Sequence, residues 1–178
     1  MSKEKIIYKN EFDNLVNSIL TNIDLSDLSD LIIVGIKTRG EYIAKRIHTI
    51  LEDKTGNKIE FGTLDISFYR DDFKNKSKWP DLKKTEIPGD IEDKNIILVD
   101  DVLYTGRTTR AALNAIMDYG RPSSVKLAVL VDRGHREMPI QPDFVGVKVD
   151  TLSSQKVNVY INEVDNKEEV EIIDSDGV

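Results

Sequence analysis

Apolar residues in this chain follow two kinds of pattern, which predict strands and helices in alternation. Continuous apolar runs rich in β-branched residues are typical of buried parallel strands, and they occur at Leu31–Ile36, Asn95–Val99 and Val125–Val131. Apolar residues spaced three and four positions apart predict helices, at Gly40–Gly56 and Thr108–Met117. Partly alternating segments predict further strands, at Ile59–Phe68, Lys156–Val164 and Glu168–Asp174. Together they predict an α/β fold with a mainly parallel sheet flanked by helices.

The segment from Arg70 to Pro88 interrupts this alternation. It is rich in Lys, Asp and Pro and has no apolar period, which predicts a long loop. A loop of this length inside a compact domain is usually a lid or is disordered, and we expect a lid here. With 178 residues, the whole chain (1–178) is expected to form a single domain with a sizeable core.

Composition narrows the class of protein. Hydrophobic residues make up 39% and charged residues 32%, a globular mixture. The chain has no cysteine, which excludes disulfides, a thiol nucleophile and a thiolate metal site. Its net charge of -7 argues against unselective nucleic-acid binding, because phosphate contact needs a basic surface. No apolar stretch approaches the roughly 20 residues of a membrane span, and Met1–Asn10 is too polar for a signal peptide, so we expect a cytoplasmic protein without a membrane partner.

Two adjacent acids, Asp100 and Asp101, end an apolar run in the stretch IILVDDVLYTGRTT, residues 96–109. Open α/β sheets bind ligands at the carboxyl ends of their strands, and the N-terminus of the helix predicted next attracts anions. Gly106 permits close backbone approach. Hydroxyl donors stand at Thr105, Thr108 and Thr109. Because carboxylates repel phosphate, the acids must face ribose hydroxyls or a Mg²⁺ ion, so the pattern predicts a site for a phosphorylated sugar.

Other kinds of site share parts of this pattern. An apolar strand ending in Asp-Asp resembles the Mg²⁺ strand of a P-loop ATPase, but the chain has no G-x-x-x-x-G-K-[ST] segment. It also lacks the G-x-G-x-x-G segment typical of dinucleotide sites. A helix cap explains Thr105 and Thr108 but not the adjacent acids. A second Gly-containing turn, Lys37–Gly40, is either another anion loop or a solvated turn with two surface cations.

The stretch ILVDDVLYTGRT resembles the phosphoribosyl pyrophosphate (PRPP) motif of type I phosphoribosyltransferases. The strings VGIKTRG, DISFYRDD, GRPSSVKLAVLVDRGHREMPI and DFVG resemble one family among them, the bifunctional pyrimidine operon regulators with uracil phosphoribosyltransferase activity, from about Val34 to Glu163. The resemblance implies the type I fold with a flexible lid and a small hood. It implies the conversion of uracil and PRPP, with Mg²⁺, into UMP and pyrophosphate. In many members it also implies UMP-dependent binding to pyrimidine-operon leader mRNA, and a homo-oligomer, a dimer or a tetramer.

The resemblance also implies roles for individual residues. The residues expected to act in catalysis are Asp100, Asp101 and Arg39. The PRPP and 5′-phosphate loop would comprise Val99, Val102, Leu103, Tyr104, Thr105, Gly106, Arg107 and Thr108. Pyrophosphate would contact Lys37, Thr38, Arg39, Gly40 and Arg70. The base would contact Asp132, Arg133, Gly134 and Val157, and Mg²⁺ would bind with PRPP near Asp100 and Asp101.

The N-terminal part of the chain departs from the family pattern. RNA-binding members usually display several Arg and Lys residues on their N-terminal helix, whereas Asn10–Ile36 contains neither residue type. The remaining candidates for RNA contact are Arg121, Lys126, His135 and Arg136. Fewer phosphate contacts mean weaker binding, so two alternatives stay open beside the uracil enzyme. They are a phosphoribosyltransferase for another base, such as a purine, and a nucleotide-sensing RNA-binding regulator with vestigial activity.

Overall fold

The computed structural model of the chain describes residues 4–9, 11–25, 28–69 and 84–174, which form two sheets and four helices. The larger sheet is parallel, in the order β3-β2-β4-β5-β6. Its strands are β2 (Leu31–Ile36), β3 (Glu60–Leu64), β4 (Asn95–Leu103), β5 (Ser124–Asp132) and β6 (Phe144–Lys148). The smaller sheet is antiparallel, in the order β1-β8-β7, with β1 (Glu4–Lys9), β7 (Gln155–Tyr160) and β8 (Glu169–Asp174). The helices are α1 (Phe12–Leu20), α2 (Arg39–Thr55), α3 (Arg107–Met117) and α4 (Asn162–Asp165).

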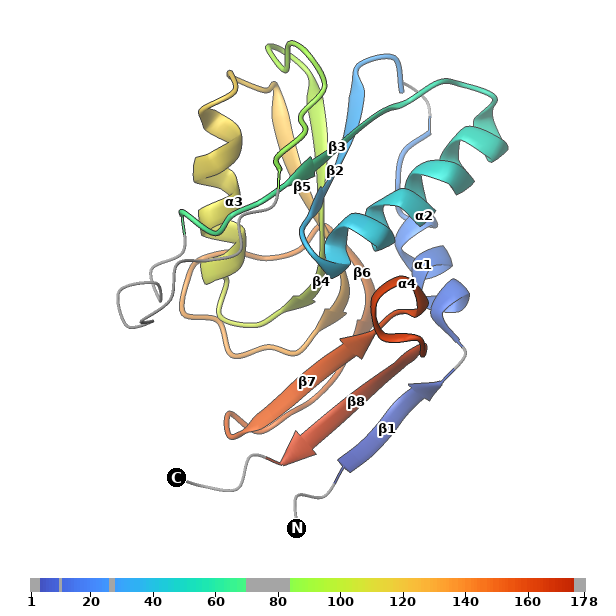
Figure 1. Cartoon of the computed structure of the whole chain (residues 1–178), viewed down its shortest axis with the longest axis vertical. Coiled ribbons are helices and arrows are strands. Elements are labelled where there is room, and N and C mark those ends of the chain that lie inside the picture. Colours follow the sequence, from blue (N-terminus) through green and yellow to red (C-terminus); the bar gives the residue numbers. More distant parts are fainter. Residues whose placement is uncertain (1–3, 10, 26–27, 70–83, 175–178) are drawn as a thin grey trace.

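Helices cover both faces of the parallel sheet, α1 and α2 on one side and α3 on the other (Figure 1). Successive side chains of a strand point to opposite faces, and β2 shows the consequence. Leu31 and Ile33 belong to the apolar cluster beneath α1 and α2, whereas Ile32 and Val34 belong to the cluster beneath α3. The unbroken apolar sequence of β2 is therefore explained by burial on both faces.

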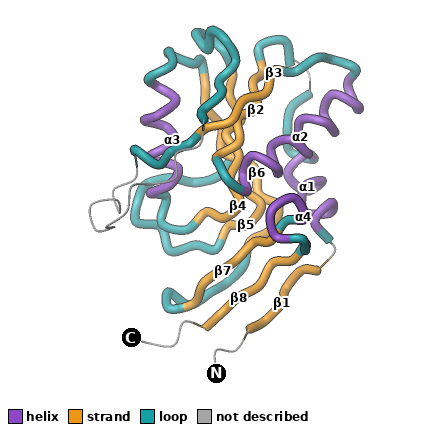
Figure 2. The backbone as a smooth tube through the Cα atoms, in the orientation of Figure 1, coloured by secondary structure: helices purple, strands orange, loops and turns teal. Residues whose placement is uncertain are grey.

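The antiparallel sheet and α4 form a separate layer, which we call the hood. It lies beyond the carboxyl ends of β4 and β5 (Figure 2). Val159, Ile161 and Val170 of the hood join the apolar cluster beneath α1 and α2. The hood is therefore packed onto the edge of the parallel sheet where ligands bind in open α/β folds.

The α/β fold with a mainly parallel sheet, predicted from the sequence, is confirmed. The structure extends β4 to Leu103, so that both acids, Asp100 and Asp101, lie inside the strand. The prediction of one strand over Lys156–Val164 is wrong in its second half, where Asn162–Asp165 forms α4. The strand predicted to end at Phe68 stops at Leu64.

Three elements went unpredicted: β1, α1 and β6.

The predicted lid falls mostly outside the described residues. Of that segment the structure describes 84–88, where Glu86 forms an antiparallel bridge with Thr63 of β3. None of the described helices is both long and apolar enough to cross a membrane.

Candidate functional site

Two helices begin next to each other at the carboxyl edge of the parallel sheet. α2 follows β2, α3 follows β4, and these two strands are paired neighbours. The residues that precede the helices, Thr38 and Gly106, do not cap them with a side-chain hydrogen bond. The N–H groups at a helix N-terminus attract anions, so this edge brings together the two helix N-termini at which phosphate and pyrophosphate binding were predicted.

Gly40 brings the first of these helix N-termini directly onto β4. A Cβ atom at Gly40 would lie 2.6 Å from the carbonyl oxygen of Val99 and 3.1 Å from the Cα of Asp100. Only a residue without a side chain permits that approach. The loop predicted to bind pyrophosphate therefore lies against the acid pair.

The acids themselves sit at the centre of the sheet edge, because β4 is flanked by β2 and β5. Asp100 is buried and Asp101 is half-buried. Each carboxylate accepts a hydrogen bond from the backbone N–H of the following residue, at 2.9 Å for Asp100 and 2.8 Å for Asp101. These bonds fix both side chains close to the strand backbone.

The rest of the predicted pyrophosphate loop is held by backbone and charge contacts. The N–H of Lys37 donates to the carbonyl of Leu64 at 2.9 Å, and its amine lies 3.8 Å from the carboxylate of Glu41. The peptide bond between Lys37 and Thr38 is cis. Arg70, predicted to contact pyrophosphate, lies outside the described residues.

The predicted 5′-phosphate loop turns at Gly106, whose φ of 89° lies in the left-handed region that favours glycine. A Cβ here would lie 3.1 Å from the Cβ of Met138. The N–H groups of Glu137 and Met138 donate to the carbonyl of Thr105 at 2.9 and 3.0 Å. The segment after β5 is thus laid directly on the phosphate loop, a contact that sequence reasoning missed.

Arg136 holds that segment in place. Its guanidinium donates to the carboxylate of Asp132 at 2.7 Å and to the carbonyls of Ile140 and Tyr104, both at 3.0 Å. Only 13% of the side chain is exposed. The structure therefore does not support the prediction that Arg136 faces RNA, because these contacts direct its guanidinium into the protein.

Arg133 is buried between Tyr104 of the predicted phosphate loop and the backbone at Leu152. Its Nη2 donates to the carbonyl of Leu152 at 3.2 Å, and its guanidinium lies 4.0 Å from the centre of the Tyr104 ring. Burial lowers the pKa of this guanidinium from its ordinary value, although the nearby Tyr104 acts the other way. A cation stacked on an aromatic face adds rigidity to the junction between the phosphate loop and the predicted base loop.

An open hollow of about 350 Å³ lies at the carboxyl ends of β5 and β6. That volume is within the range of small-molecule sites, roughly 300–1,000 Å³. The predicted base contacts Asp132, Arg133 and Gly134 line it, together with His135 and with 148–151. Val157, the fourth predicted base contact, lies elsewhere: it is in β7 and packs against the core cluster beneath α1 and α2.

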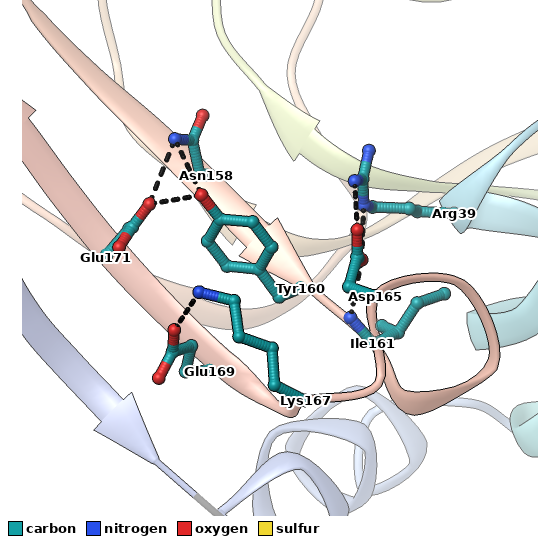
Figure 3. Close-up of polar contacts among 8 residues, drawn as sticks. All are labelled: Arg39, Asn158, Tyr160, Ile161, Asp165, Lys167, Glu169 and Glu171. Carbon is teal, nitrogen blue, oxygen red and sulfur yellow. Dashed lines mark hydrogen bonds and ion pairs between the residues drawn. The ribbon is translucent and has the colours of Figure 1, made fainter.

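Arg39, the first residue of α2, forms a bidentate ion pair with Asp165 of the hood (Figure 3). Its Nε donates to Oδ2 of Asp165 at 3.0 Å and its Nη2 to Oδ1 at 2.7 Å. The pKa of the Arg39 guanidinium is raised, chiefly by this hydrogen bonding and further by the negative charge of Asp101. Arg39 therefore connects the start of α2 to the hood. Nothing in the local sequence indicated Asp165, which directly follows the predicted strand Lys156–Val164.

The candidates for RNA contact are divided between the two ends of β5. Arg121 and Lys126 are exposed near its amino end, whereas His135 and Arg136 follow its carboxyl end. A nine-residue strand is about 30 Å long, at roughly 3.3 Å per residue. His135 is exposed, and its Nε2 lies 2.7 Å from the carbonyl oxygen of Thr151. The four residues do not form one patch.

Among the described residues, no cluster of three or more Asp, Glu or His side chains is placed to hold a metal ion. Mg²⁺ often binds through substrate phosphates, water and only one or two carboxylates. Asp100 and Asp101, beside two anion-binding loops, fit that second mode of binding.

Comparison with known proteins gives the chain two kinds of relative. The family model described as the phosphoribosyl transferase domain matches residues 5–164. A "Bifunctional protein PyrR" from Latilactobacillus sakei is 54% identical over 147 residues, which cover 82% of each chain. Another from Bacillus subtilis is 50% identical over 151 residues, which cover 84% of this chain and 83% of that protein.

Solved structures of purine-type enzymes share the fold. A hypoxanthine phosphoribosyltransferase from Staphylococcus aureus superposes with a TM-score of 0.63 at 18% identity, and covers 93% of this chain and 91% of its own. The corresponding enzyme from Trypanosoma cruzi gives a TM-score of 0.66 at 15% identity, and covers 93% and 89%. At these identities the likeness establishes the fold and not the base.

The ion pair between Arg39 and Asp165 makes a pH-dependent prediction. The guanidinium hydrogen bonds lower the pKa of the Asp165 carboxyl, aided by the N–H of Ile161 and opposed by burial. An acid whose folded pKa is lowered stabilises the fold above its unfolded pKa, about 3.9, and loses that contribution as the pH falls through the folded value. Asp165→Asn should therefore be less stable than the parent at pH 7, with a difference that shrinks below about pH 4. Urea unfolding over a pH series measures this, and a difference that is constant with pH would contradict it.

Proposed function

Since the chain belongs to the phosphoribosyltransferase family and, within it, to the bifunctional PyrR proteins, we propose that it is a uracil phosphoribosyltransferase. Its substrates are uracil and PRPP, and its products are UMP and pyrophosphate. The choice of uracil as the base is supported by the motif VDRGHRE after the third buried strand. This motif specifically resembles the corresponding segment of the uracil-using regulators.

The observation that supports this function best is the contact of Gly40 with the backbone of Val99 and Asp100. It places one helix N-terminus against the acid pair, while α3 begins just beyond the same strand. PRPP carries phosphate at both ends of a ribose. Two anion-binding loops on either side of two carboxylates match that distribution of charge and hydroxyl groups.

Each part of the site then has a chemical task. The α3 N-terminus, with Thr105 and Thr108, binds the 5′-phosphate, and the Lys37–Gly40 loop binds pyrophosphate. Asp100 and Asp101 accept hydrogen bonds from the ribose hydroxyls. As the bond from C1 to pyrophosphate breaks and the bond to the base nitrogen forms, positive charge develops on the ribose. The two carboxylates stabilise that charge from fixed positions, and the base nitrogen gives its proton to the released pyrophosphate or to solvent, which completes the transfer.

The base is assigned to the hollow bordered by Asp132, Arg133 and Gly134. Uracil offers two carbonyl oxygens and N–H groups, which backbone groups and one Arg can satisfy. Mg²⁺ is proposed to enter with PRPP and to neutralise phosphate charge beside Asp100 and Asp101.

A radiolabelled transfer assay with PRPP and a panel of bases tests the proposal, with a double variant as its control. Wild-type protein should convert uracil in preference to hypoxanthine and guanine. Asp100→Asn together with Asp101→Asn should remove most activity, since loss of one such electrostatic group commonly costs about 2.7–4 kcal/mol of barrier. The circular dichroism of the variant should match wild type. Preference for a purine would overturn the base assignment, and near-native turnover by the double variant would overturn the role of the acids.

We propose RNA binding as a second function, at reduced strength. The relatives are named bifunctional, and Arg121 and Lys126 present exposed cations at the end of β5 remote from the proposed active site. The acidic N-terminal segment works against this function. α1 carries Asp13 in its first turn and no basic residue in its last turn.

Few exposed cations should give a shallow dependence of RNA affinity on salt. Log affinity falls with log salt at a slope of about -0.7 to -0.9 per neutralised phosphate. Paired changes at Arg121 and Lys126 to Glu should weaken binding and leave uracil transfer intact. The measurement is a gel-shift titration against a pyrimidine-operon leader with UMP at two salt concentrations. Tight, steeply salt-dependent binding would show that the acidic segment does not limit RNA contact.

A further inference from the structure

The bidentate pair between Arg39 and Asp165 connects two parts of the chain that are 126 residues apart. Both side chains are largely shielded, with exposed fractions of 33% for Arg39 and 14% for Asp165. The Asp165 carboxylate is itself fixed, because its Oδ2 accepts the N–H of Ile161 at 3.0 Å. The Asp165 N–H in turn donates to the carbonyl of Ile161 at 2.7 Å. The acid is therefore a rigid element of the hood.

The geometry of the pair leaves one edge of the guanidinium open to a ligand. Asp165 takes the edge formed by Nε and Nη2. The remaining nitrogen, Nη1, points away from Asp165 in Figure 3. Nη1 and the second N–H of Nη2 form the other fork of the guanidinium, and such a fork matches the oxygens of a phosphate.

We propose that Asp165 is a positioning residue for the pyrophosphate group of PRPP, acting through Arg39. It holds one edge of the guanidinium so that the other edge stays turned away from the hood. This proposal rests on the proposed transferase function and adds a residue of the hood to that site.

The physical reason is preorganisation. An Arg side chain loses considerable rotamer freedom when a ligand immobilises it. A side chain already fixed by a neighbour loses less, and the ligand binds more tightly without any added contact. Because Arg39 is also the first residue of α2, the same pair steadies the helix N-terminus that follows the pyrophosphate loop.

A gate would behave in the opposite way. If Asp165 competed with PRPP for the same N–H groups, its removal would strengthen PRPP binding. The two roles therefore differ in the sign of one measurable change.

The chain supplies a matched control on the same two helices. Arg46 of α2 binds Glu163 of α4, with Nη2–Oε2 and Nη2–Oε1 distances of 3.0 Å and an Nε–Oε1 distance of 3.2 Å. Arg46 lies two turns along α2 from Arg39, remote from the pyrophosphate loop. Arg46 also binds the carboxylate of Glu168, so Glu163→Gln together with Glu168→Gln weakens a comparable contact of α2 with this part of the chain without altering Arg39. Glu163→Gln alone removes one of the two charges that bind Arg46.

The experiment compares wild type, Asp165→Asn, Glu163→Gln/Glu168→Gln, Arg39→Ala and the Asp165→Asn/Arg39→Ala double variant. Calorimetry gives affinities for PRPP and UMP, and steady-state assays give kcat and KM. Asp165→Asn should weaken PRPP binding and raise its KM by on the order of tenfold, the scale of a lost charge-assisted contact. UMP affinity and kcat should change little. Glu163→Gln/Glu168→Gln should leave PRPP binding unchanged, and the Asp165→Asn/Arg39→Ala variant should bind PRPP no worse than Arg39→Ala.

Several outcomes would overturn the positioning role. They are tighter PRPP binding by Asp165→Asn, equal losses for PRPP and UMP, and an equal loss in Glu163→Gln/Glu168→Gln. If Asp165→Asn unfolds, Asp165→Glu serves instead, since it keeps the charge but displaces it by one methylene, and unchanged PRPP affinity would then refute the proposal. Wild-type protein that binds no PRPP and transfers no base would refute the proposed function. Wild-type activity with an unaffected Asp165→Asn variant refutes only the positioning role.

Discussion

The missing side chain of Gly40 is the constraint on which the site depends. At that position a Cβ would meet the carbonyl oxygen of Val99 at 2.6 Å, so any larger residue would displace the start of α2 from β4. Gly35, in β2, plays a related part, because a Cβ at that position would lie 2.5 Å from the Cα of Glu41. Two glycines thus allow the helix to lie close against the sheet. The closeness brings an anion-attracting helix N-terminus to a pair of carboxylates.

Opposite charges around this site are paired at defined positions. Arg39 pairs with Asp165 and its pKa is raised further by the charge of Asp101, and Asp132 pairs with Arg136. The second pair is directed into the protein and fastens the segment after β5. The pair of Arg39 and Asp165 lies where the Lys37–Gly40 loop meets the hood. A site that must bind both anionic phosphates and a cation-like transition state needs both signs at defined positions.

The sequence predicts the parts of this fold that depend on local pattern. Leu31–Ile36 is apolar throughout because helices cover both of its faces, so its burial could be predicted from the sequence. The site at the acid pair and Gly106 could also be predicted, because strand, turn and helix follow each other within a few residues. α1 was not predicted, although its buried residues Phe12, Val16 and Ile19 follow helical spacing. The short strand β6, with half-buried Val145 and Val147, gives a weak pattern.

Contacts between distant segments were the part that local reasoning could not supply. Asp165 meets Arg39 across 126 residues, and Glu137 and Met138 cover a loop about 30 residues earlier. Arg136 looked like a surface cation because its charge is visible in the sequence, whereas its four acceptors are not. Three of those acceptors are backbone carbonyls, and no composition or spacing marks a carbonyl as a partner.

The fold alone does not identify the base. The same sheet and helices occur in enzymes named for hypoxanthine. In this chain Asp132 is engaged by Arg136, and its carboxylate also accepts the N–H of Gly134 at 3.0 Å. Arg133 is left beside the hollow as a buried cation, held by one carbonyl and the Tyr104 ring. A base that presents carbonyl oxygens suits such a cation, since each oxygen accepts a hydrogen bond that burial makes stronger. Tyr104 belongs to the predicted phosphate loop, so Arg133, a predicted base contact, is stacked on that loop.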